Sequence, residues 1–189
     1  QSIELLVNLL KYLERNTGNI TSYRNIANLN NSNEHTVEQY ISYLENAFIV
    51  NKLKKFSWKT NAIFDTNRKY YFIDNIFCHF ADIEDKLENI CYQHLLRTYG
   101  EGNIFLGRDD KGKEIDFVVK IDNKKMSAFQ ICYELNDSNF ERENSSLQLF
   151  EKHMDKTENK LQIVYFYNNM TVETPQNIEL MNVIDFLLD

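Results

Sequence analysis

The stretch 114–134, EIDFVVKIDNKKMSAFQICYE, is the most informative part of the chain because it has the pattern of two β-strands joined by a polar turn. Successive side chains of a strand take opposite faces, so Glu114 and Asp116 should share one face and Ile115 and Phe117 the other. The second strand carries polar side chains at alternate positions, Gln130, Cys132 and Glu134. Asp is disfavoured inside a strand, and such a local conflict indicates function. The stretch therefore predicts a strand pair whose polar groups could form a metal site.

Helical and extended patterns surround this strand pair. We expect a helix over 84–99, strands over 103–106, 114–121, 126–133 and 161–167, and a helix over 140–154. A final short helix is expected over 176–188, after the single proline, Pro175. The predicted order of this second half is αβββαβ.

The first half predicts a winged helix-turn-helix domain. Apolar residues recur at helical spacing in 3–15, 23–29 and 34–46, and the β-rich segments 48–56 and 70–73 follow, separated by a polar loop near 60–69. The fold class is therefore α+β. We place a winged-helix domain at 1–80 and a second domain at 81–189.

A basic wing is the strongest sign of nucleic-acid binding. Six basic residues stand in or beside the predicted hairpin: Lys52, Lys54, Lys55, Lys59, Arg68 and Lys69. They could contact DNA phosphates, or they could form a solvated edge that prevents strand pairing. The third helix carries acids and no Lys or Arg, which disfavours its insertion into a groove.

Composition limits the remaining classes of function. The 189 residues have a formal net charge of −7, which opposes unspecific attraction to phosphate backbones. The chain has no run of roughly 18 apolar residues, no secretory signal and no phosphate-binding loop, so a cytoplasmic location without a membrane is expected. The three cysteines lack metal-ligand spacing, which favours buried free thiols.

An acidic residue in one strand and E-x-K in the next resembles the PD-(D/E)xK nuclease core. Asp116 fits that pattern, whereas Gln130-Ile131-Cys132 stands where E-x-K would be. Glu88 shares a helical stripe with apolar residues, so it should face the protein rather than solvent, and it could share Mg²⁺ with Asp116. A hydrogen-bonded Arg or Tyr would satisfy Glu88 equally well. Glu134 is a further candidate ligand on the strand of Gln130.

Longer stretches resemble one family. LENICYQHLLRTYG from Leu87, GKEIDFVVK from Gly112, FQICYEL from Phe129 and ERENSSLQLF from Glu141 are similar to the uncharacterised C-terminal domain behind the ATPase module of prokaryotic AAA+ superfamily ATPases. HTVEQYISYLENAFIVNKLKKF from His35 and KYYFIDNIF from Lys69 resemble its helix-plus-wing region. The resemblance implies a restriction-endonuclease-like domain with a central mixed sheet, and core positions for Glu88, Asp116 and Gln130. ATP binding would belong to the ATPase module, which this chain lacks.

Three functions follow as hypotheses. The first is a recognition and interaction region of an ATP-binding protein, associated with nucleic acid, whose altered nuclease-like site is non-catalytic or weakly catalytic. The second is an active Mg²⁺-dependent nuclease or resolvase that uses Glu88, Asp116 and Gln130 or Glu134. The third is a protein-interaction module without a nucleic-acid role.

Overall fold

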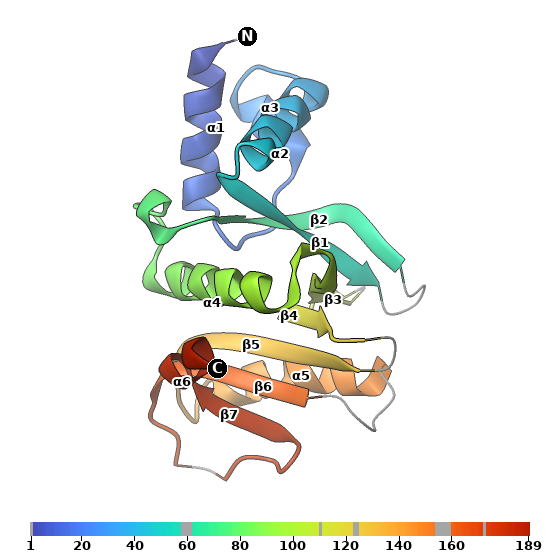
Figure 1. The fold of residues 1–189 in the computed structure, drawn as a ribbon, viewed down its shortest axis with the longest axis vertical. Helices are drawn as coiled ribbons and strands as arrows, with labels where there is room; N and C mark the ends of the chain where they lie inside the picture. Colours follow the sequence, from blue (N-terminus) through green and yellow to red (C-terminus); the bar gives the residue numbers. More distant parts are fainter. Residues whose placement is uncertain (1, 58–61, 110, 123–124, 154–159, 172) are drawn as a thin grey trace.

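A computed structural model describes residues 2–57, 62–109, 111–122, 125–153, 160–171 and 173–189 (Figure 1). Within these residues, seven strands form one mixed sheet in the order β2-β1-β3-β4-β5-β6-β7. The strands are β1 (Val50–Ser57), β2 (Ala62–Phe72), β3 (Ile104–Arg108), β4 (Glu114–Lys120), β5 (Met126–Leu135), β6 (Lys160–Asn168) and β7 (Ile178–Asn182). The α+β class is confirmed. No described helix is both long and apolar enough to cross a membrane.

Three helices form the first half as predicted. They are α1 (Ile3–Arg15), α2 (Tyr23–Leu29) and α3 (Glu34–Asn46). The Ser2 hydroxyl caps α1 by accepting from the Leu5 amide, and the Asn33 side chain caps α3 by accepting from the Thr36 amide. Their apolar faces meet each other and one face of the β1–β2 hairpin in a single buried cluster.

The hairpin is part of the large sheet. β1 pairs antiparallel with β2, and on its other side it pairs parallel with β3 at Lys55–Leu106 and Phe56–Gly107. Tyr70 and Phe72 face the helices of the first half, whereas Leu53 and Tyr71 belong to the core of the second half. The two halves of the chain therefore share strands β1 and β2.

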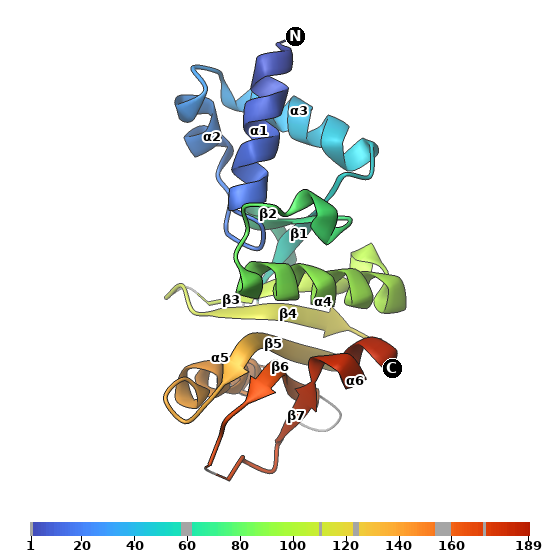
Figure 2. The same ribbon diagram turned by 90° about the vertical axis from the view of Figure 1, so that its left-hand side faces the viewer.

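Helices cover both faces of the second half of the sheet. α4 (Ile83–Tyr99) and α6 (Val183–Leu188) pack on one face, and α5 (Phe140–His153) packs on the other (Figure 2). Short 3-10 turns, Asn75–Phe77 and Glu101–Asn103, precede and follow α4. Cys78, Cys91 and Cys132 are free and buried, as predicted.

Two predicted segments were wrong. The polar loop expected near 60–69 belongs largely to β2, which begins at Ala62 because its backbone pairs with β1; a strand at the edge of a sheet tolerates polar residues. The helix expected over 176–188 is a strand followed by a short helix. Residues 178–182 pair with β6, and Asn182 then caps α6 by accepting from the Ile184 amide. Sheet pairing overrode the helical pattern there.

Candidate functional site

The candidate site is a cluster of three carboxylates around one buried ammonium group. Lys69 Nζ lies 3.1 Å from Glu88 Oε1, 3.6 Å from Glu114 Oε2 and 3.7 Å from Asp116 Oδ1. Lys69 is only 4% exposed. Buried charges in proteins are normally paired, and each member of this cluster meets that requirement. The structure thus brings Glu88 and Asp116 near each other around a lysine from β2.

Alternation along β2 places Lys69 and Tyr71 on the face toward α4. The Tyr71 hydroxyl donates to Glu88 Oε1 over 2.5 Å, and its ring stacks on Tyr92 of α4 with 4.3 Å between ring centroids. Glu88 thus has a tyrosine partner, which was one of the alternatives predicted from the sequence, and in addition a lysine partner. Two residues of one strand fix the orientation of this carboxylate.

A β-bulge in β4 aims Asp116 at the cluster. Phe105 pairs with Val118 and Gly107 pairs with Ile115, so that Asp116 and Phe117 together face one residue of β3. Ile115 and Phe117 consequently enter different cores, and the prediction that they share one face was wrong. A bulge of this kind re-aims a side chain without breaking the sheet.

Asp116 also lies where β4 and β5 separate. Their pairing runs from Lys120–Met126 to Phe117–Phe129, while β5 continues beside β6 to Leu135. Asp116 Oδ2 accepts a hydrogen bond of 2.9 Å from the amide of Ile131, which would otherwise pair with β4. The carboxylate therefore replaces a backbone partner at the point of separation.

The first half of the chain closes one side of the cluster at Gly18. This residue has a φ of +71°, and its amide donates to the Tyr70 carbonyl over 3.1 Å. A Cβ atom at this position would lie 3.2 Å from Glu88 Oε1. Glycine is therefore required both by the backbone conformation and by the close approach of Glu88.

An acidic cavity of about 260 Å³ opens beside the cluster, between the first turns of α4 and α5. Its charged and amide lining is Glu84, Asp85, Glu88, Asp116, Gln130, Arg142 and Glu143. Gln130 Oε1 is buried and has no hydrogen-bond partner among the described residues. Arg142 is mostly exposed and pairs with its buried neighbour Glu143. The cavity therefore carries more negative than positive charge.

The pKa values reflect this excess of carboxylates. Burial opposes the charge of Lys69, but the carboxylates of Glu88, Asp116 and Glu114 outweigh it and raise its pKa. Burial, and then the charge of Glu88, raises the pKa of Asp116 to about 8. Burial, with the charge of Asp82, raises the pKa of Asp85 to about 6. Near neutral pH the cluster therefore keeps Lys69 in its protonated form and also favours the protonated form of Asp116.

The arrangement does not fit a divalent cation while Lys69 lies in it. Within the described ranges, no three His, Cys, Asp or Glu side chains form a group that could hold a metal ion. Glu88 and Asp116 both turn to the ammonium, and Mg²⁺ requires carboxylate or water oxygens on all sides. A metal would have to displace Lys69 first.

Gln130 is the only one of the predicted second-strand residues that lines the described acidic cavity. Glu134 is exposed and accepts from the Asn169 side chain over 2.9 Å. Burial raises the pKa of Cys132 to about 12, and its thiol donates to the Glu134 carbonyl oxygen over 3.0 Å. Cys132 is therefore a neutral thiol that supplies no cation to the site.

The predicted basic wing has several different environments. Lys54 is exposed, Lys55 is half-buried, and Lys52 lies 3.7 Å from Glu45. The Arg68 guanidinium lies 3.9 Å from the centroid of the Tyr23 ring. Lys59 lies outside the described residues. The prediction that Lys69 belongs to an exposed wing was wrong. Its side chain is buried because the alternation of side chains along β2 directs it toward α4.

Replacing Asp116 by asparagine tests the electrostatics. The raised pKa of Asp116 means that the folded chain binds a proton there more tightly than the unfolded chain, so this stabilisation falls as the pH rises from about 4 to about 8. Between pH 5 and pH 8, the free energy of unfolding of Asp116→Asn should therefore fall less than that of the unmodified chain. Urea unfolding measures it, with exposed Glu141→Gln as the control. Equal slopes for Asp116→Asn and the unmodified chain would contradict the assignment.

Comparisons place the chain near uncharacterised proteins. A family model described as "Domain of unknown function (DUF8612)" matches residues 1–87. An "Uncharacterized protein" of Haemophilus influenzae is 28% identical over 195 residues, which cover 97% of this chain and 46% of that protein. "Uncharacterized protein MJ1544" of Methanocaldococcus jannaschii is 27% identical over 199 residues, which cover 98% and 43%. This chain thus spans less than half the length of these relatives. No solved structure matches it.

Proposed function

We propose that this chain is a non-catalytic recognition and interaction region of a longer ATP-binding protein, built from a winged helix and a nuclease-like core. The observation that carries the proposal is the position of Lys69. Its ammonium lies against Glu88 and Asp116, on which a metal-dependent nuclease would rely, and also against Glu114. An internal cation that neutralises these groups removes the need for Mg²⁺ and leaves no open coordination position.

The length of the relatives supports the proposal that this chain is a region of a longer protein. The chain aligns over almost its whole length with less than half of each relative, so the remainder of such a protein has room for a further domain. An ATPase module is the domain that the resemblance in the sequence implies. ATP would bind to that module and not to this chain.

An exposed apolar segment offers a surface for that module. Five large apolar side chains from the end of β2 to the first residue of α4 are 43–65% exposed: Ile73, Ile76, Phe77, Phe80 and Ile83. Residues 73–85 also contain four acids and no Lys or Arg. Exposed apolar patches are typical of protein contact sites, and the acidic surroundings favour a partner surface with a basic rim.

A second candidate function is DNA binding through the hairpin. Lys54 is exposed at the surface of β1, and Lys55 is partly accessible. Phosphate contacts of this kind give affinity that weakens steeply with salt. Binding of a fluorescent duplex that is lost on replacing Lys54 and Lys55 by methionine, and kept on replacing Lys120, would support this role.

Cleavage of supercoiled plasmid tests the absence of catalysis. With Mg²⁺ or Mn²⁺, the purified chain should produce no nicked or linear DNA above the level of its Asp116→Ala variant. Nicking by the unmodified chain that disappears in Asp116→Ala would overturn the proposal in favour of a metal-dependent nuclease.

Co-purification tests the interaction role. The ATP-binding part of the longer polypeptide, expressed separately, should be retained by this chain and lost when Ile76 and Phe80 are both replaced by serine. Replacing exposed Leu29 and Tyr43 on α2 and α3 by serine provides the matched control. Equal retention by both double variants, or none by the unmodified chain, would count against this surface.

A further inference from the structure

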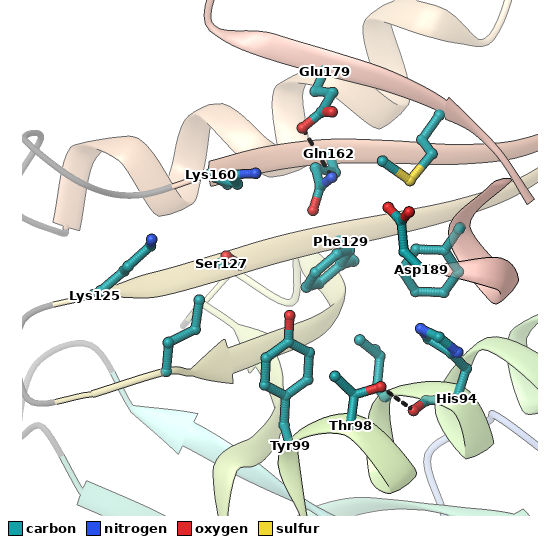
Figure 3. A pocket seen from close by; sticks show the side chains of 14 residues that line it. His94, Thr98, Tyr99, Lys125, Ser127, Phe129, Lys160, Gln162, Glu179 and Asp189 are labelled. Atoms are coloured by element: carbon teal, nitrogen blue, oxygen red, sulfur yellow. Dashed lines mark hydrogen bonds between the residues drawn. The ribbon is translucent and has the colours of Figure 1, made fainter.

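A second cavity of about 300 Å³ lies at the opposite end of β5 from the carboxylate cluster, on the sheet face that α4 and α6 cover (Figure 3). The C-terminal turns of α4 form one wall, and α6 and the strands β5 to β7 form the others. Apolar side chains in the lining include Leu95, Ile121, Phe129, Met181 and Phe186. The volume is at the lower end of the range for small-molecule sites, which are about 300–1,000 Å³.

Two lysines stand together at one end of this cavity. Lys125 immediately precedes β5 and Lys160 is the first residue of β6, where Ser127 is paired with Lys160 in the parallel register. Figure 3 shows both side chains on the same side of the pocket, with Ser127 near them. Neither ammonium group has an ion-pair partner among the described residues.

Two hydroxyl groups add hydrogen-bonding capacity. Ser127 is 1% exposed and lines the cavity, and its hydroxyl has no partner in the part of the chain that the structure describes. The Tyr99 hydroxyl points from α4 into the same space, again without a partner in the described ranges (Figure 3). Both hydroxyl groups are therefore available to donate a hydrogen bond to an acceptor bound in the cavity.

Two carboxylates stand near the lysine end: Asp122 Oδ1 accepts from the Lys125 amide over 2.8 Å, and Glu179 lies on β7 beside the strand of Lys160. Gln162 Nε2 donates to Glu179 Oε2 over 3.0 Å, which orients this amide toward β7. Asp189 and His94 lie on the opposite side of the pocket from Lys125 in Figure 3. Burial, with the charge of Arg97, lowers the pKa of His94, so this side adds no positive charge near neutral pH. Lys125 and Lys160 are therefore the two ammonium groups of the cavity lining.

We propose that this cavity binds a small organic phosphate, with the phosphate held by Lys125, Lys160, Ser127 and Tyr99 and the organic part against Phe129 and Phe186. Phosphate oxygens accept several charge-assisted hydrogen bonds at once, which matches two ammonium groups and two hydroxyls. The aromatic and aliphatic wall accommodates a small planar group. The site is separate from the carboxylate cluster and independent of the function proposed for it.

Calorimetric titration with phenyl phosphate tests the proposal. The chain should bind phenyl phosphate saturably, with inorganic phosphate weaker because it lacks the ring, and with phenol, which lacks the phosphate, weakest. Replacing both Lys125 and Lys160 by methionine should weaken binding at least tenfold, because a hydrogen bond between charged groups contributes about 1.5–3 kcal/mol and 1.4 kcal/mol is about tenfold. Ser127→Ala should weaken binding less than the double lysine variant.

Lys120→Met is the matched control, since it removes one exposed positive charge from β4 outside the cavity. Equal weakening by Lys120→Met and by the cavity variants would overturn the proposal, as would benzoate binding more tightly than phenyl phosphate. Amide signals of Ser127 and Phe129 in the unmodified chain provide a second measurement. They should shift with phenyl phosphate, and unshifted signals at saturation would also overturn it.

Discussion

Replacing Lys69 by methionine is expected to lower the free energy of unfolding by about 3–5 kcal/mol near pH 7.5, the range for breaking a buried ion pair by removing one partner. Lys69 is 4% exposed and is the ammonium shared by Glu88, Glu114 and Asp116. Methionine fills a similar volume but leaves these carboxylates without their cation. Urea unfolding followed by circular dichroism measures the loss.

The same experiment at pH 5 distinguishes electrostatics from packing. Carboxylates without a cation can take up protons at the lower pH, so the loss caused by Lys69→Met should be smaller there. Lys54→Met, an exposed position on β1, should change stability by no more than about 0.5 kcal/mol. A pH-independent loss for Lys69→Met, or one no larger than that of Lys54→Met, would contradict the role given to this ammonium group.

Replacing Tyr71 by alanine should cost about 3–5 kcal/mol, the range for truncating a large aromatic side chain in a core. Tyr71 is fully buried, stacks on Tyr92 and contacts Phe117 at 5.7 Å between ring centroids. Tyr71→Phe keeps the ring and removes only the hydroxyl that donates to Glu88, so about 1–3 kcal/mol is expected. The difference between the two variants separates ring packing from the hydrogen bond.

Tyr71→Ala also tests whether the two halves of the chain unfold together. Tyr71 packs on α4, while its neighbours Tyr70 and Phe72 pack on α1 to α3. Because one strand serves both cores, slow-exchanging amides in α1 to α3 should lose protection along with those in α4. Unchanged exchange in α1 to α3, with faster exchange in α4 alone, would show that the halves are independent.

Local signals in the sequence predicted much of the fold. Helices α1 to α3 have apolar residues at helical spacing, and side chains cap α1 and α3, so the limits of these helices follow from the chain itself. The apolar stripe that carries Glu88 correctly placed this residue facing the protein interior, where it meets Asp116 through Lys69. The helix limits and the position of Glu88 both follow from hydrophobic periodicity, which depends only on residues that are close in the sequence.

Features that depend on distant pairing were not predictable in this way. The bulge at Asp116 arises from pairing with β3, the extension of β2 from pairing with β1, and the strand β7 from pairing with β6. Lys69 was assigned to an exposed wing because its strand was expected to begin one residue later. The signal that was missed is its spacing from Tyr71, which places both side chains on one face of a strand.

Titration of the unmodified chain with Mn²⁺ at pH 7.5, followed by electron paramagnetic resonance, tests the central claim that Lys69 and not a metal neutralises the carboxylate cluster. The unmodified chain should show no saturable Mn²⁺ binding, and Lys69→Ala should gain a binding site that Asp116→Asn abolishes. Saturable Mn²⁺ binding to the unmodified chain that is lost in Asp116→Asn would contradict it.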